Sequence, residues 1–126
     1  MVAEDQAILD PRPLDQLRAL ARPGRPNVLV RLLTGYLQSV PGEVQQLSDA
    51  IVSADFGTCG NLAHGLKAVT GSVGGHQLSS LCGTIESLSK REDESALWAV
   101  LGDLSALSEA TTAALTELLQ SERGNA

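Results

Sequence analysis

A histidine and a lysine three residues apart are the side chains of this sequence best placed for chemistry. His64 and Lys67 lie among apolar residues whose spacings of four, three and four are typical of an amphipathic helix: Leu62, Leu66, Val69 and Val73. At about 100° per residue, His64 points almost directly away from them. A neutral imidazole is nucleophilic near neutral pH and can accept a phosphoryl group. The ammonium of Lys67 can pair with phosphoryl oxygens or with a carboxylate of a partner.

The outer face of this predicted helix carries very small side chains around His64. Apart from Lys67, its residues have no side chain larger than a methyl group: Gly57, Gly60, Ala68 and Gly71. An interior glycine costs a helix about 1 kcal/mol relative to alanine, so several of them indicate that another molecule approaches the imidazole closely. We therefore expect a docking face made of Gly57, Gly60, Ala68, Gly71 and Gly75.

A glutamate on the following helix is predicted to reach the same histidine. Gly74 and Gly75 are typical of a tight corner that turns the chain back antiparallel. His64 lies ten residues before this corner and Glu86 eleven after it, so the two are expected at similar heights. Our hypothesis is that Glu86 holds one imidazole nitrogen and leaves the other free to react. A solvated glutamate on a helix flank is the alternative.

The second histidine and the two cysteines show no comparable arrangement. His76 follows the corner directly, and we expect it at the surface. No two of these residues have metal-ligand spacing, such as a Cys-x-x-Cys pair, so no metal site is expected. Cys82 falls on an apolar helix face and is predicted to be a buried, reduced thiol. Cys59 lies near a helix start, where nothing supports a redox role, and a reducing compartment fits both.

The elements that must position His64 are all predicted to be helices, since no segment alternates with the period of a strand. A short helix starts at Asp10 and Pro11 and ends before Pro23. Apolar residues then keep helical spacing from Leu29 to Ile51, which predicts one helix kinked at Pro41. A new helix starting at Pro41 with Ser39 as its cap remains the alternative.

Two further helices follow the one that contains His64, which itself begins after a turn at residues 55–58. One is predicted around residues 78–88, before a polar loop at 90–93. The last runs from about residue 97 to about Glu122, and residues 123–126 should fray. Four long amphipathic helices with short loops predict an all-α fold, an antiparallel four-helix bundle with a short additional N-terminal helix. We expect one domain over residues 1–126, with an ordered core at about 8–122.

Composition and charge exclude several functional classes. The formal net charge of −6 argues against nucleic-acid binding and against docking on an anionic membrane. No apolar run is long enough to cross a bilayer, and the N-terminus lacks a signal segment. Five arginines gather near the start, forming a solvated face or, alternatively, a rim for an acidic partner: Arg12, Arg18, Arg22, Arg25 and Arg31. Three lone aromatic residues are expected to pack in the core or at its ends: Tyr36, Phe56 and Trp98.

The residues around His64 resemble the signature of histidine-containing phosphotransfer (HPt) domains. That signature is roughly Ala-His-x-Leu-Lys-Gly, then small residues, then an apolar residue with glycine, then leucine. The matching positions are Ala63, His64, Leu66, Lys67, Val73, Gly74 and Leu78. The pairs at 81–82 and 85–86 and the pattern from Leu14 to Ile51 also resemble the family, so the likeness covers nearly the whole chain. Residues 71–74 are most similar to HPt domains at the C-terminus of hybrid sensor histidine kinases.

The resemblance implies a phosphorelay intermediate without kinase activity of its own. His64 would accept a phosphoryl group from an aspartate of one receiver domain and pass it to another receiver. The chain would bind no cofactor, because Mg²⁺ belongs to the partner receiver. We expect a cytoplasmic monomer, and polar ends favour the C-terminal domain of a membrane-bound sensor kinase over a free-standing protein. Gly60 and Gly65 superficially resemble a phosphate loop, but Lys67 does not follow the second glycine directly.

One departure from the family pattern keeps a different function open. The family usually has glycine one turn after the histidine, where this chain has Ala68, and the extra methyl lies beside the imidazole. An HPt-like adaptor that binds a partner without phosphotransfer is therefore one alternative. Another is the dimerisation and phosphoacceptor region of a histidine kinase. That region needs a dimer and usually an acidic residue directly after the histidine, where this chain has Gly65.

Overall fold

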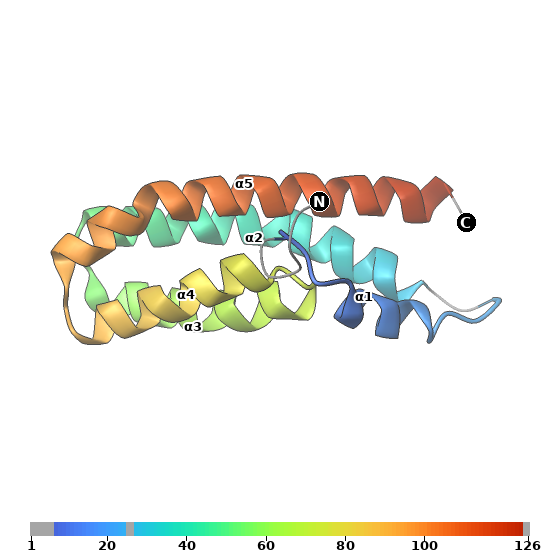
Figure 1. The fold of residues 1–126 in the computed structure, drawn as a ribbon, viewed down its shortest axis with the longest axis horizontal. Coiled ribbons are helices and arrows are strands. Elements are labelled where there is room, and N and C mark those ends of the chain that lie inside the picture. Colours follow the sequence, from blue (N-terminus) through green and yellow to red (C-terminus); the bar gives the residue numbers. More distant parts are fainter. Residues whose placement is uncertain (1–6, 25–26, 125–126) are drawn as a thin grey trace.

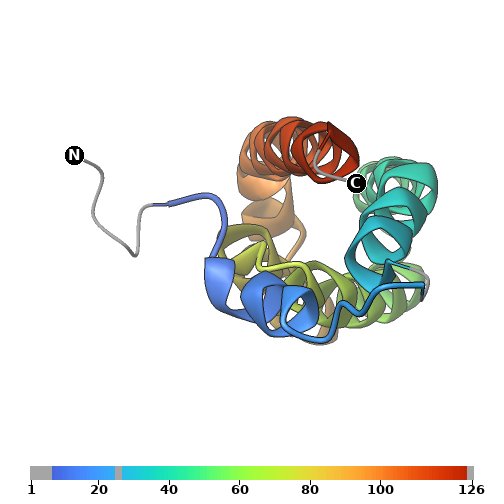
Figure 2. The same ribbon diagram turned by 90° about the vertical axis from the view of Figure 1, so that its right-hand side faces the viewer.

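The computed structural model describes residues 7–24 and 27–124. Within these ranges the regular elements are all helices: α1 (Pro11–Arg18), α2 (Val28–Val52), α3 (Phe56–Ser72), α4 (His76–Lys90) and α5 (Glu94–Gly124). The four long helices lie side by side, with α2 against α5 and α3 against α4 (Figure 1). Seen from the end they surround one core, and α1 lies across that end (Figure 2). The predicted all-α bundle with a short N-terminal helix is confirmed.

Four helices begin at a side chain that accepts a hydrogen bond from a backbone N–H of the first turn. In α5 this side chain is Asp93, which accepts from the N–H of Ala96 (3.2 Å). Asp10 accepts from the N–H of Arg12 (3.0 Å) at the start of α1. Asn27 caps α2, and Asp55 caps α3. These N–H groups have no partner inside their own helix, so each cap fixes where its helix begins. The turn predicted at 55–58 is wrong in its bounds, because residues 56–58 already form the first turn of α3.

Helix α2 continues without a break through Pro41, which confirms the prediction of one long helix. The hydroxyl of Ser39 donates to the carbonyl oxygen of Gly35 (2.9 Å) inside the helix rather than capping a new one. The last helix, α5, is slightly longer than predicted. It includes Arg123 and Gly124 instead of ending near Glu122. Residues 125 and 126 lie outside the described residues.

All four long helices contribute apolar side chains to the core, and leucines of α2 and α5 are among the most deeply buried. Four of them have no exposed surface: Leu33, Leu47, Leu104 and Leu115. Tyr36 is also buried, which raises the pKa of its hydroxyl to about 12. Phe56 packs against the edge of the core, but Trp98 is 50% exposed, so its predicted core position is wrong. The preceding residue, Leu97, takes the inward position on α5, which turns Trp98 outward.

Both cysteines are buried and free, as predicted for Cys82. Burial raises the pKa of the Cys82 thiol to about 11 and also raises that of Cys59. A buried thiol of raised pKa holds little reactive thiolate, so neither residue is suited to redox chemistry. No helix among the described residues has both the length and the apolar character that crossing a bilayer would require.

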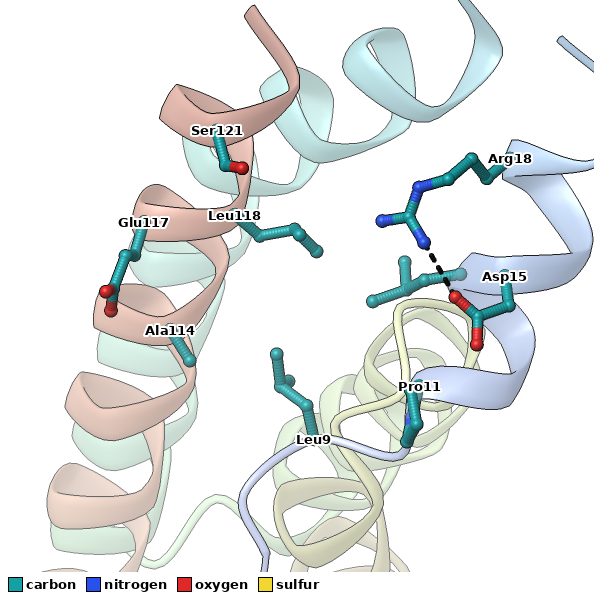
Figure 3. Close-up of a pocket in the computed structure, with 9 residues that line it drawn as sticks. Leu9, Pro11, Asp15, Arg18, Ala114, Glu117, Leu118 and Ser121 are labelled. Carbon is teal, nitrogen blue, oxygen red and sulfur yellow. Dashed lines mark hydrogen bonds and ion pairs between the residues drawn. The ribbon is translucent and has the colours of Figure 1, made fainter. Parts of the chain in front are cut away.

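A pocket lies between α1 and α5 (Figure 3). The pocket has a volume of about 410 Å³, and Leu9 and Leu118 point into it. Arg18 spans from α1 to Glu122 of α5 (2.6 Å) and also pairs with Asp15 (2.7 Å).

Two of the five N-terminal arginines are thus held by carboxylates of the chain itself, because Arg12 likewise pairs with Asp10. This favours the simpler interpretation of the cluster, a solvated face. Arg25 lies outside the described residues.

The corner between α3 and α4 is tied to the N-terminal segment. Gly74 has a φ of +80°, a conformation that L side chains rarely adopt, and a Cβ there would overlap the carbonyl oxygen of Asp10. The Asp10 N–H donates to the Gly74 carbonyl oxygen (2.6 Å). The side-chain amide of Gln77 donates to the carbonyl oxygen of Ala7 (2.8 Å). The segment before α1 therefore covers the point at which the chain turns towards α4.

Candidate functional site

His64 lies on the outer surface of α3, as the apolar spacing predicted. Its side chain is 71% exposed, whereas Ala63 and Leu66 of the same helix are buried in the core. Gly57 and Ala68, two residues of the predicted docking face, are exposed on the same helix. A partner can therefore reach the imidazole without any movement of the fold.

Glu86 of α4 holds one nitrogen of this imidazole. The distance from Nδ1 of His64 to Oε2 of Glu86 is 2.8 Å, so the predicted contact is confirmed. A carboxylate only accepts hydrogen bonds, which assigns the ring hydrogen to Nδ1. The Nε2 atom then carries the lone pair and has no hydrogen-bond partner among the described residues.

Two lysines surround the same carboxylate. The ammonium of Lys67 donates to Oε1 of Glu86 (3.1 Å), and that of Lys90 lies 3.7 Å from Oε2. The pKa of Glu86 is lowered, first by the hydrogen bond from Lys67 and then by that from His64. Sequence reasoning missed Lys90, although its place four residues after Glu86 on one helix is the spacing at which such side chains meet.

Two glycines of α3 lie against serines of α4 near this contact. A Cβ on Gly60 would lie 3.7 Å from Cβ of Ser89, and one on Gly71 would lie 3.4 Å from Oγ of Ser79. Both glycines thus face α4 and are only partly exposed. Their predicted place on an open docking face is corrected in part, because α4 partly covers both, although Gly60 also lines the surface beside His64.

Gly75, the fifth residue of the predicted docking face, is buried, so that prediction is wrong. A Cβ on it would lie 3.2 Å from Cγ2 of Thr111 on α5 and 3.2 Å from the carbonyl oxygen of Thr70. The corner turns this residue towards α5 and away from His64. The docking face that remains exposed around the imidazole is therefore smaller than predicted.

His76 is not the surface residue that the sequence predicted. Both ring nitrogens are buried and have no hydrogen-bond partner within residues 7–24 and 27–124. The ring lies close enough to Asp10 to help lower the pKa of that carboxyl, which Arg12 chiefly holds at about 2. The N-terminal segment thus covers a histidine that helical periodicity left exposed.

A hollow of about 460 Å³ lies beside His64, between the first half of α3 and the second half of α4. Its lining combines the imidazole and its carboxylate with the small residues of α3: Phe56, Gly57, Gly60, Asn61, His64, Glu86, Ser89, Lys90 and Glu92. The reactive nitrogen therefore stands at the border of a concave surface. Among the described residues there is no group of three or more His, Cys, Asp or Glu side chains that could hold a metal ion.

The family model of the Hpt domain matches residues 31–122. The chain belongs to the Hpt domain family. As an Hpt domain it is a histidine phosphotransfer intermediate of two-component phosphorelays, and its partners are receiver domains.

The fold of this Hpt domain is shared with a solved structure, that of histidine-containing phosphotransfer protein B from Pseudomonas aeruginosa PAO1. The TM-score is 0.81, and the match covers 90% of this chain and 96% of the other at 18% sequence identity. A search of the curated proteins found no match.

Proposed function

We propose that His64 is the phosphoacceptor of this Hpt domain. It takes a phosphoryl group from the aspartate of one receiver and passes it to the aspartate of another. The observation that carries this proposal is the pairing of an exposed imidazole with a carboxylate: Nδ1 is occupied by Glu86, and Nε2 is left open to solvent.

The transfer requires no net gain or loss of a proton. The Nε2 lone pair attacks the phosphorus of the aspartyl phosphate, and a P–N bond forms as the P–O bond to aspartate breaks. The aspartate leaves as a carboxylate, in line with the incoming nitrogen. The ring keeps its Nδ1 proton, and Glu86 offsets the positive charge that the ring acquires. The aspartate of the second receiver then attacks the same phosphorus, and neutral His64 leaves.

Lys67 and Lys90 supply positive charge next to the phosphoryl group. Both ammonium groups pair with the carboxylate that orients the imidazole, so both lie close to the ring. Charge on the equatorial oxygens is what a phosphotransfer site has to stabilise. We assign this role first to Lys67, which is hydrogen-bonded to Glu86, and then to the more distant Lys90.

The receiver supplies the rest of the reaction. It docks over Gly57, Ala68 and the hollow beside His64 and brings the Mg²⁺, so this chain binds no cofactor. We propose that the chain acts in the cytoplasm as a monomer, alone or attached to a hybrid sensor kinase. Sizing at low concentration tests the monomer and distinguishes it from a dimeric kinase region.

The experiment that tests His64 is incubation of the protein with a panel of phosphorylated receivers. We expect acid-labile, base-stable phosphate on the wild type, mapped to Nε2 of His64 by NMR, and none on His64→Gln. Because the ring is exposed, this variant should keep its fold, which circular dichroism checks. Absence of labile phosphate with every receiver, or its persistence in His64→Gln, would overturn the proposal.

The exposed methyl of Ala68 favours a second candidate, an adaptor that binds receivers without phosphotransfer. This methyl lies on the docking side of α3, four residues after His64. The same panel decides between the two functions, because an adaptor would bind a receiver tightly while His64 remained unphosphorylated.

A further inference from the structure

Helix α4 contains a glycine at a position where the fold does not require one. Gly83 lies in the middle of the helix, where glycine is less favourable than alanine and where no unusual backbone angle calls for it. It stands three residues before Glu86 and four after Ser79, so all three share the stripe of α4 that faces α3. All three lie against one residue of α3, Lys67, although Glu86 also contacts His64 and Ser79 also lies against Gly71.

Ser79 holds the backbone of Lys67, and Glu86 holds its ammonium. The Ser79 hydroxyl donates to the Lys67 carbonyl oxygen (2.7 Å), and the Lys67 ammonium donates to Oε1 of Glu86 (3.1 Å). Between these two contacts the aliphatic stem of Lys67 crosses α4 at Gly83. A Cβ at position 83 would lie only 3.2 Å from Cδ of Lys67, closer than side chains ordinarily pack.

The other two glycines of the α3–α4 interface differ from Gly83 in this respect. Gly60 and Gly71 would place a Cβ at 3.7 and 3.4 Å from serine side chains, which is ordinary packing distance. Of these three glycines, only Gly83 would bring an added Cβ closer than ordinary packing distance to a side chain, that of Lys67, which contacts Glu86 beside His64. General helix packing therefore does not account for it.

We propose that Gly83 is a positioning residue for phosphotransfer, a notch in α4 that seats the stem of Lys67 and fixes its ammonium beside Glu86 and His64. This inference rests on the proposed role of His64. A methyl group at position 83 displaces the stem by a few tenths of an ångström. The ammonium then leaves the place where it pairs with Glu86 and where the incoming phosphoryl oxygens arrive.

The test compares Gly83→Ala with Gly102→Ala, a glycine in the interior of α5 whose added Cβ would meet no atom within 4 Å. Both variants should raise the thermal midpoint by up to about 4 °C, because alanine favours a helix. Only Gly83→Ala should slow phosphotransfer to His64, by about three- to tenfold, since small misplacements of a positioned group are costly. The Glu86 carboxyl, followed by NMR, should titrate at higher pH in Gly83→Ala alone.

A double substitution separates positioning from a general change in the helix. In a Lys67→Ala background, Gly83→Ala should have no further effect on the rate, because the side chain that it displaces is gone. An unchanged rate and an unchanged Glu86 titration in Gly83→Ala would overturn the inference, as would an equal slowing with and without Lys67. Failure of the proposed function would look different, since the wild type itself would then take no phosphate.

Discussion

The two helix pairs of this bundle are packed by different means. Where α2 meets α5, large apolar side chains such as Leu47 and Leu104 fill the space between the helices. Where α3 meets α4, glycines face serines and the contacts near the surface are polar. Burial of apolar surface is the main stabilising contribution to folding. Both pairs bury apolar side chains, but only α3 and α4 add polar contacts at the surface where His64 lies.

The close approach of α3 and α4 is what creates the site. A glutamate reaches an imidazole on a neighbouring helix at 2.8 Å only when the two backbones are near each other. At this surface Gly60 and Gly71 lie against serines of α4, and Gly83 leaves room for the stem of Lys67. The difference between the pairs predicts that substitutions in α2 and α5 change stability without changing chemistry, whereas substitutions at the α3–α4 surface do the reverse.

The largest effect is expected from Leu104→Ala in α5. Leu104 is fully buried, and truncation of such a leucine leaves a cavity that lowers the free energy of unfolding by about 2–5 kcal/mol. Urea unfolding measures this loss. At a temperature where the variant is folded, its rate of phosphotransfer should equal that of the wild type, because His64 and Glu86 lie on the other helix pair.

Leu20→Ala is the matched control, since Leu20 is 60% exposed and its loss should change the free energy of unfolding by less than about 0.5 kcal/mol. If Leu104→Ala slowed transfer while fully folded, the separation between a stabilising pair and a reactive pair would not hold.

Glu86→Ala should have the converse effect, a loss of rate with little loss of stability. Without the carboxylate, Nδ1 of His64 and the ammonium of Lys67 lose their shared acceptor. The rate should fall by about tenfold, the equivalent of one hydrogen bond to a charged group. Phosphotransfer kinetics measure this, and a rate that stays at the wild-type value would refute the orienting role.

The same variant should alter the acid limb of unfolding. The pKa of Glu86 is lowered from 4.5 by Lys67 and His64, so the folded state releases this proton more readily than the unfolded state. The contacts therefore stabilise the fold above about pH 4.5, and their contribution is lost as the pH falls through the lower folded value. Glu86→Ala should flatten the pH dependence of unfolding in that window, and Glu86→Gln should do the same.

Sequence reasoning located the reactive contact but not its surroundings. Helical spacing indicates which face of a regular helix is buried. Counting residues from a corner indicates how far along each of the two helices a residue lies. Together they predict that His64 and Glu86 lie near each other. At the corner itself this reasoning does not apply. Gly75 and both ring nitrogens of His76 are buried at a turn that the segment around Asp10 covers, and neither the turn nor this segment has a helical period.

The glycines show a second limit of the same reasoning. A glycine on an outer face is ambiguous, because it can make room for a partner or for a neighbouring helix. Only the distance to α4 separates Gly57, which is exposed, from Gly60 and Gly71, which meet serines of that helix. Trp98 was misplaced for a related reason, since its neighbour Leu97 already occupied the core.

The smallest effect is expected from Ala68→Gly, which tests the exposed side of α3 rather than its packed side. Removal of the methyl should lower the free energy of unfolding by about 1 kcal/mol, because glycine is the poorer helix former. Phosphotransfer should be unchanged or faster, since the receiver gains room beside the imidazole. Thermal unfolding and transfer kinetics with one receiver measure both quantities. A sharp loss of transfer would mean that receivers need the methyl as a contact, so that small side chains near His64 select partners rather than admit them.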